Sequence, residues 1–248
     1  MNTFSLLQLS LDQKIERRSF EDASDALSSI ARADCARLHR HLYGVVVSDL
    51  PEDEALAFQT ELAQRDFPTI VVPDRDLPLL QDSFQVQQIE VLEENLVLTD
   101  SMGHQRIRPL AELVFLAAGV VSRLHFKSEW NQHLDSGIES YGAARLVTEH
   151  ELYEESEMEF RLDFFFSTSP ERQHASACSE SIIIYRDVPL MLRDMDGLRG
   201  LTAAMAELLP PERLSSFFHN TGSHPHYPTL RSYQNEIRWF FHGLGLPA

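Results

Sequence analysis

The sequence of 248 residues lacks the features of a secreted, disulfide-bonded or membrane-spanning protein. Its only cysteines, Cys35 and Cys178, are too few and too far apart for a disulfide framework or a cysteine metal site, so we expect a reducing compartment. The N-terminal residues contain no basic segment followed by a long apolar core, so we expect no signal peptide. The longest apolar run near mid-chain, residues 113–121, is far shorter than the roughly 20 residues that span a bilayer. We therefore expect a soluble cytoplasmic protein.

Basic residues are scarce relative to acidic ones. The chain has 21 Lys and Arg against 38 Asp and Glu, so its formal net charge at pH 7 is -17. A surface this acidic repels nucleic-acid phosphates and anionic lipid head groups, so we expect neither nucleic acid nor a membrane among the partners. Hydrophobic residues make up 43% of the chain, which is an ordinary share for a globular protein with a buried core.

A glycine-rich phosphate loop is missing from the place where a nucleotide-binding protein would have one. Residues 43–48 have the pattern of a buried strand, residues 51–65 that of a helix and residues 68–72 that of a second strand, as in a right-handed crossover between parallel strands. A helix N-terminus favours an anion, but here four carboxylates would repel one, so we expect no nucleotide and no other cofactor. These carboxylates belong to Asp49, Glu52, Asp53 and Glu54.

The pattern changes at residues 72–78, which contain two prolines and three charged residues and are predicted to be a linker. We predict an α+β protein with a small α/β domain at residues 1–78, built as a ferredoxin-like or strand–helix–strand layer, and a β-rich domain at residues 79–248. In the second part we expect a polar loop at residues 127–142. We also expect strands at residues 84–92, 95–99, 105–108, 157–167 and 181–185, and a final helix at residues 230–242.

Three stretches of the second part carry a resemblance to a known family. Residues 96–103, residues 107–121, and residues 161–166 together with 182–186 follow the order hairpin, short turn, strand and further strands before a closing helix. This order resembles a pleckstrin-homology-like (GRAM-like) module, and the whole layout resembles a group of bacterial proteins with the same two parts. The resemblance implies a β-rich module with a C-terminal helix, and it implies no activity, cofactor or site residue.

The best candidate metal ligands are His219, His224 and His226. In an extended segment His224 and His226 could face one ion, which His219 could reach from a preceding strand, and three imidazoles would suit zinc. The alternative is a histidine-rich surface loop whose shape is fixed by Pro225 and Pro228. We favour this alternative because no His-Glu-x-x-His pattern accompanies the three histidines.

A second candidate lies on one face of the predicted strand at residues 157–167. Glu159, Arg161 and Asp163 alternate along it, so an arginine lies between two carboxylates that could act as acid and base if burial separated their pKa values. The alternative is the solvated or cross-strand-paired face of an ordinary antiparallel sheet. We favour this alternative because five glutamates occur from Glu151 to Glu159.

Patterns for a catalytic nucleophile are weak. Ser140 lies between two glycines but lacks the spacing of a nucleophile elbow and the strand that would lead into one. Cys178 has His174 four residues before it, and we expect both in a polar loop, where an ordered base and an electropositive pocket are not expected.

These observations favour a non-enzymatic binding or scaffold protein that acts through protein–protein contacts. A basic protein surface would suit so acidic a chain, and self-association through an open sheet edge is the second kind of partner that we consider. The alternative function is a metal-assisted hydrolase that uses His219, His224 and His226, with Asp163 or Glu159 as its base.

Overall fold

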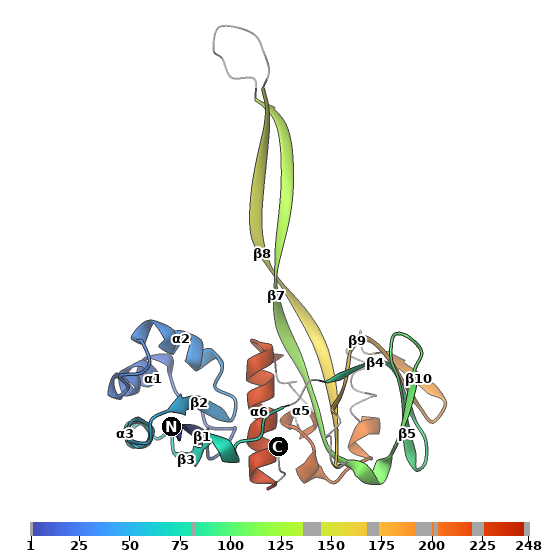
Figure 1. The fold of residues 1–248 in the computed structure, drawn as a ribbon, viewed down its shortest axis with the longest axis horizontal. Coiled ribbons are helices and arrows are strands. Elements are labelled where there is room, and N and C mark those ends of the chain that lie inside the picture. The colour runs from blue at the N-terminus through green and yellow to red at the C-terminus, as the bar shows by residue number, and fades with distance from the viewer. Residues whose placement is uncertain are drawn as a thin grey trace.

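The fold has two separate β-sheets, with one helix between them and a long two-stranded arm that rises from the second sheet (Figure 1). The computed structural model describes residues 2–80, 83–135, 145–167, 174–191, 200, 203–219 and 226–245. Within these ranges it describes the backbone alone for residues 124–135, 145–155 and 191. The mixture of helices and open sheets makes this an α+β protein.

The first sheet has three strands in the order β2-β1-β3, and β1 is antiparallel to both of its neighbours. The predicted strand–helix–strand unit is present, but β1 lies between its two parallel strands, so they are not neighbours. Three helices cover one face of the sheet and enclose a core around Leu6, Phe20 and Phe58 (Figure 1). The elements are Phe4–Gln8 (β1), Arg17–Ala23 (α1), Arg32–Arg40 (α2), Val45–Leu50 (β2), Glu52–Ala63 (α3) and Thr69–Pro73 (β3).

The other face of this sheet packs against the last helix, α6 (Leu230–Gly243). Trp239 of α6 contacts the cluster around Leu7 and Val72, and its Nε1 donates a hydrogen bond to the Gln8 carbonyl at 2.6 Å. Gly44 makes this contact feasible, since its φ is +77° and a Cβ there would lie 2.7 Å from Trp239 Cγ. The final helix therefore joins the two ends of the chain.

The second sheet has the strand order β11-β7-β8-β9-β4-β5-β6, with β10 paired to β9. The β4–β9 and β7–β11 pairs are parallel, and the other pairs are antiparallel. The strands are Phe84–Val91 (β4), Asn95–Thr99 (β5), Gln105–Pro109 (β6), Leu113–Asp135 (β7), Arg145–Phe166 (β8), His174–Tyr185 (β9), Val188–Met191 (β10) and His226–Tyr227 (β11).

The two faces of the second sheet are covered differently. One face holds the larger apolar core, in which Leu162 and Phe164 of β8 meet Phe217 of the short helix α5 (Ser216–His219). The other face is covered by α6, whose Tyr233, Ile237 and Phe241 pack on the strands. Because side chains alternate along a strand, Arg161 and Asp163 of β8 point toward α6.

The predicted polar loop at residues 127–142 is wrong for its first nine residues, because β7 continues as a strand to Asp135. The β7–β8 ladder is continuous out to the pair of Asp135 with Arg145. β9 pairs with β8 only up to the pair of Arg161 with Cys178, so among the described residues the outer part of the ladder consists of two strands (Figure 1). Within residues 127–135 only Trp130 and Leu134 are apolar, which is too few to show the alternation by which a strand is recognised.

No helix of the described ranges is long and apolar enough to cross a bilayer.

Candidate functional site

The face of β8 under α6 contains a buried polar cluster centred on Asp163. The Asp163 side chain is 1% exposed, and its two carboxylate oxygens accept hydrogen bonds from different elements. His174 of β9 donates from Nε2 to Oδ1 at 2.7 Å, and the Tyr233 hydroxyl of α6 donates to Oδ2 at 2.6 Å. One carboxylate thus fastens the helix to two strands.

Arg161 supplies the opposite charge in this cluster. Its Nε lies 3.7 Å from Asp163 Oδ2, and its Nη2 donates to the Ser176 hydroxyl at 2.7 Å. Arg161 is 8% exposed. Of the favoured prediction, a solvated or cross-strand-paired face, the solvated part is wrong because α6 covers Arg161 and Asp163, whereas both side chains do pair across the strands with β9. Glu159 is less deeply buried and forms an ion pair with Arg123 at 2.7 Å.

The partners of Asp163 keep it ionised in spite of its burial. Burial alone would raise the pKa of Asp163, but the hydrogen bond from His174, the electrostatic interactions with His174 and Arg161 and the hydrogen bond from Tyr233 hold the pKa below its ordinary value. Burial is the largest influence on Arg161 and would lower its pKa, but the electrostatic interactions with Asp163, Tyr233 and Glu159 and the hydrogen bond to Asp163 together raise the pKa above its ordinary value. The cluster around Asp163 is therefore a buried ion pair that orients α6.

A second buried carboxylate belongs to Glu236, which lies about one helical turn after Tyr233 in α6. Its Oε2 accepts from the Tyr227 hydroxyl at 2.6 Å, and its Oε1 accepts from the Ser216 hydroxyl at 2.6 Å and from the Ser216 backbone N–H at 3.2 Å. Burial raises the pKa of Glu236, although the hydrogen bonds from Ser216 and Tyr227 oppose the shift. Glu236 therefore ties α6 to β11 and α5.

We expect Glu236→Gln to change how stability depends on pH. Because the pKa of Glu236 is raised in the folded state, its contribution to the free energy of unfolding is fully present below about pH 4.3, the ordinary pKa of glutamate. That contribution is lost as the pH rises through the folded-state pKa. Glutamine cannot ionise, so the free energy of unfolding of the variant should increase relative to that of the wild type as the pH rises. The increase should be about 1.4 kcal/mol for each unit by which the pKa of Glu236 is shifted. Urea unfolding at pH 4.5, 6 and 7.5 measures this gain. The exposed Glu93→Gln is the control, and a gap that stays constant with pH would contradict the expectation.

Small residues of β7 make room for the tyrosines of this face. Gly119 is the cross-strand partner of Arg161, and a Cβ at Gly119 would lie 2.8 Å from Tyr227 Cδ2 and 3.1 Å from Tyr233 Cδ2. Ala117 lies opposite Asp163 in the same ladder. The short side chains let Tyr227 and Tyr233 pack edge to face, with ring centroids 5.2 Å apart, directly on the strand.

The predicted metal ligands are only partly within the described ranges. His224 lies outside them. His219 Nε2 is 3.3 Å from the Leu214 carbonyl, and His226 Nε2 is 3.0 Å from the Ser122 hydroxyl, so each described histidine has its own partner. Across the described ranges no group of three His, Cys, Asp or Glu side chains is arranged to hold a metal ion. The zinc site remains a prediction.

The structure places the predicted nucleophile candidates differently from one another. Ser140 lies outside the described residues. His174 and Cys178 both lie in β9, so the prediction of a polar loop for them is wrong. His174 is held by Asp163 and stacks on Phe165 with ring centroids 4.2 Å apart. Cys178 instead faces an open cleft, so the two do not form a cysteine–histidine pair.

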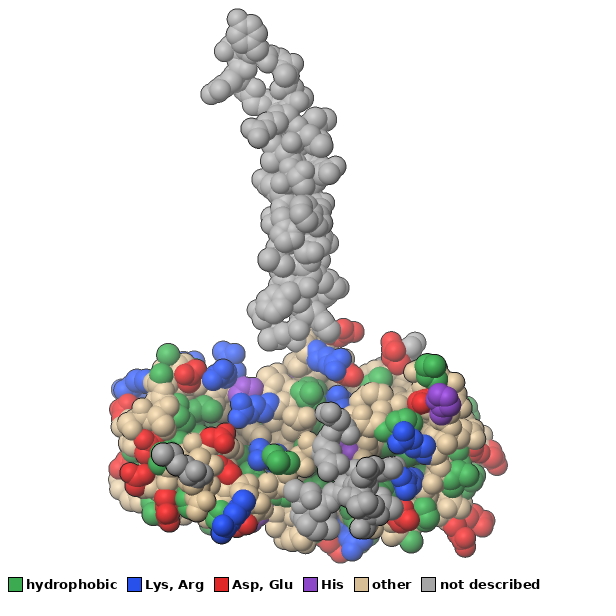
Figure 2. All heavy atoms as spheres, viewed as in Figure 1, with side chains coloured by type: hydrophobic (Ala, Val, Ile, Leu, Met, Phe, Trp, Pro, Cys, Tyr) green, Lys and Arg blue, Asp and Glu red, His purple; other side chains and the backbone are tan. Residues whose placement is uncertain are grey.

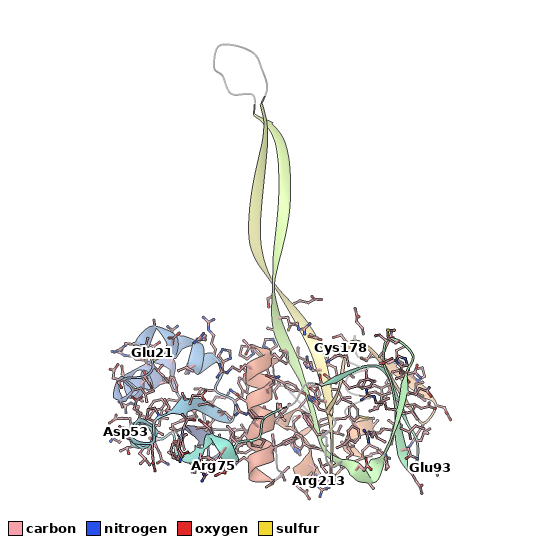
Figure 3. All side chains as sticks on the ribbon, in the orientation of Figure 1. Glu21, Asp53, Arg75, Glu93, Cys178 and Arg213 are labelled. Atoms are coloured by element: carbon pink, nitrogen blue, oxygen red, sulfur yellow. The ribbon has the colours of Figure 1, made fainter. Side chains whose placement is uncertain are left out.

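This open cleft lies at the root of the arm, where β8 and β9 separate. Figure 3 labels Cys178, one of the residues that line it. Its volume is about 460 Å³. The lining residues are Arg123, Glu157, Met158, Glu159, Cys178, Ser179 and Glu180. Acidic and basic side chains are visible at the base of the arm in the space-filling view (Figure 2). Unlike the cluster around Asp163, this cleft can be reached by a partner.

Neither a family model, a curated protein nor a solved structure matches the chain. The geometry alone therefore has to support any functional conclusion.

Proposed function

We propose that this protein is a non-enzymatic binding module that contacts another protein through its arm, defined as residues 124–135 of β7, residues 145–156 of β8 and the residues that join them. The observation that carries the proposal is the continuation of the β7–β8 ladder twelve residue pairs beyond Arg123 and Glu157, with no third strand beside it among the described residues. At roughly 3.3 Å per residue, the arm extends about 40 Å from the body. Two strands alone bury too little surface to be stable in water, so a docked partner would explain their length.

The charge of the arm indicates the chemistry of the partner. Between residues 145 and 156, the β8 part of the arm has four glutamates and a single arginine. The unpaired outer edges of both strands offer backbone N–H and C=O groups to an added strand. A basic protein surface complements this charge, and association with it would weaken as salt screens the glutamates.

The two-part architecture belongs to the same proposal. Residues 1–78 would form a small α/β domain, and residues 79–248 a pleckstrin-homology-like domain. The β4–β5–β6 meander, the separate sheets and the C-terminal helix α6 support this division. In this scheme the sheets form the platform and the arm makes the contact with the partner, although a fold by itself says little about function.

An arm-shortened variant tests the proposal. His125 and Glu155 are a directly opposed pair of the ladder, so replacing residues 126–154 with Asn-Gly should close a tight hairpin without touching the body. Each chain is used to capture proteins from a lysate. A partner that binds the arm should be recovered on the shortened chain in an amount more than about tenfold lower than on the full chain, which corresponds to a loss of ~1.4 kcal/mol of binding free energy.

A neutral-arm variant is the matched control for charge. It keeps the length of the arm and changes four glutamates of β8 to glutamine, those at positions 149, 151, 154 and 155. We expect it to retain the partner at low salt with a smaller dependence of affinity on salt. Equal capture by the full and the shortened chains would overturn the proposed role of the arm.

A further inference from the structure

The second sheet has two open edges with complementary sequence patterns. One is the outer edge of β6, the last strand of the sheet, which contains Arg106, Ile107 and Arg108. The other is the edge of β8 at the root of the arm, past the point where β9 turns away, which contains Glu157, Met158 and Glu159. Both patterns alternate a charge, an apolar residue and a charge, with opposite signs.

The backbone groups of Met158 point out of the β8 edge. Two residues later in the strand, the Phe160 N–H points to the β9 side and donates to the Ser179 hydroxyl at 3.0 Å. Because backbone groups alternate in direction along a strand, the N–H and C=O of Met158 point to this same side. No described strand pairs with them there.

The backbone groups of Ile107 point out of the β6 edge by the same reasoning. The Leu110 N–H donates to the Glu94 carbonyl at 2.8 Å, toward β5. Ile107 is an odd number of residues away, so its N–H and C=O point away from β5 and into solvent. Met158 and Ile107 are also 67% and 65% exposed, which is unusual for large apolar side chains in strands.

We propose that the β6 edge of a second copy adds as a strand to the β8 edge at the root of the arm. Antiparallel addition with Met158 opposite Ile107 lets these two residues exchange both backbone hydrogen bonds and brings their side chains together on one face. The same register puts Glu157 and Glu159 opposite Arg108 and Arg106 on the other face. The cleft of about 460 Å³ between β8 and β9 is the entrance for the incoming strand.

The charges of the two edges select this pairing over others. Two β8 edges would set glutamates against glutamates, and two β6 edges would set arginines against arginines, so only the unlike edges match. Arg106 now lies over the Phe84 ring at 4.0 Å, and Arg108 lies 3.8 Å from Glu112, so both are already held in the strand. The net charge of -17 opposes association, but at physiological salt charges farther apart than about 8 Å are largely screened, whereas paired ones are not.

The contact is heterologous, because each copy uses a different edge for each neighbour. It therefore produces a series of growing assemblies, and the small area involved predicts weak association with Kd roughly between 10 and 1000 µM. The inference goes beyond the proposed function and is independent of it, because residues 126–154 take no part in the contact.

The test is analytical ultracentrifugation of the full chain over a range of concentrations, with two proline variants. Met158→Pro and Ile107→Pro each remove an N–H that points to solvent and leave the intramolecular ladders intact. We expect the weight-average sedimentation coefficient of the wild type to rise continuously with concentration, and each variant alone to stay monomeric. Each variant keeps the edge that the other has lost, so an equimolar mixture should form a one-to-one dimer.

Two further sets of variants keep the result interpretable. Met158→Val and Ile107→Val keep the N–H and should still associate. If a proline variant does not fold, Glu157→Lys/Glu159→Lys and Arg106→Glu/Arg108→Glu replace the pair. Each is expected to be monomeric alone, and the equimolar mixture should form growing assemblies like the wild type, because both kinds of edge then meet an edge of opposite charge. The arm-shortened variant should associate like the wild type, so failure of the proposed function would leave this result unchanged. A wild type that stays monomeric at all concentrations, or variants that associate like the wild type, would overturn the proposal.

Discussion

Replacing Asp163 with alanine is expected to lower the free energy of unfolding by about 3–5 kcal/mol, the usual cost of breaking a buried ion pair from one side. The change removes the acceptor for His174 and for the Tyr233 hydroxyl, and it leaves the guanidinium of Arg161 buried without its counter-charge. Urea unfolding at pH 7 measures the loss.

The pH dependence of this loss has a defined sign. Because the pKa of Asp163 is held below its ordinary value, its contribution to the free energy of unfolding is fully present above about pH 3.9, the ordinary pKa of aspartate. That contribution is lost as the pH falls through the lower folded-state pKa. The gap between the wild type and Asp163→Ala should therefore narrow only in strong acid. Asp163→Asn keeps the shape of the side chain and one hydrogen-bond acceptor, so its free energy of unfolding should lie between those of the wild type and Asp163→Ala.

An exposed acid is the matched control for Asp163. Glu93→Ala removes a carboxylate from the surface of the same sheet and should change stability by no more than about 0.5 kcal/mol. If Asp163→Ala cost as little as the control, Asp163 could not be the residue that fastens α6 to β8 and β9.

In the isolated protein, amide hydrogens of the arm are expected to exchange about a thousandfold faster than those of β7 within the body, around Leu116 and Val121. The body segment of β7 has β8 on one side, β11 on the other and apolar cores on both faces. The arm has only its own two strands. Local opening of such a hairpin costs little, whereas the body opens only with a large part of the fold.

Hydrogen exchange followed by mass spectrometry at low protein concentration measures this difference. The arm-shortened variant is the control, because its body peptides should keep the protection of the wild type. Arm amides as slow as those of the body in the free chain would mean that the arm is stable without a partner, and the main reason to infer one would be lost.

The sequence predicts the elements that border a core and misses those that do not. The hairpin of β4 and β5 and the helix α6 agree with the predictions within about two residues, since their apolar residues have the period of a strand or a helix. Residues 127–135 contain only two apolar residues, Trp130 and Leu134, so the alternation is too sparse to predict a strand. Only the pairing with residues 145–153 makes them a strand, and that pairing is not local in the sequence.

The sequence predicts only part of the buried polar cluster, namely Arg161 and Asp163. The alternation of Arg161 and Asp163 along one strand indicates a shared face, but the charges themselves suggest solvent. Tyr233 and Glu236 lie outside the candidate sites that the sequence predicts, although a glutamate beside Ile237 in the apolar stripe of α6 is a signal for a buried acid with partners. Their partners come from β8, β11 and α5, so only the tertiary structure brings them together.

Photo-crosslinking from the arm shows directly whether the arm contacts a partner protein. A photoreactive phenylalanine analogue replaces Trp130 in the arm of one chain and Leu79, an exposed residue of the body, in a second chain. Both proteins are irradiated in the same lysate. We expect covalent adducts with a distinct partner protein from position 130. These adducts should be lost on competition with the unlabelled full chain but not on competition with the arm-shortened variant. Adducts from position 79 alone, or competition by the arm-shortened variant as strong as by the full chain, would contradict this expectation.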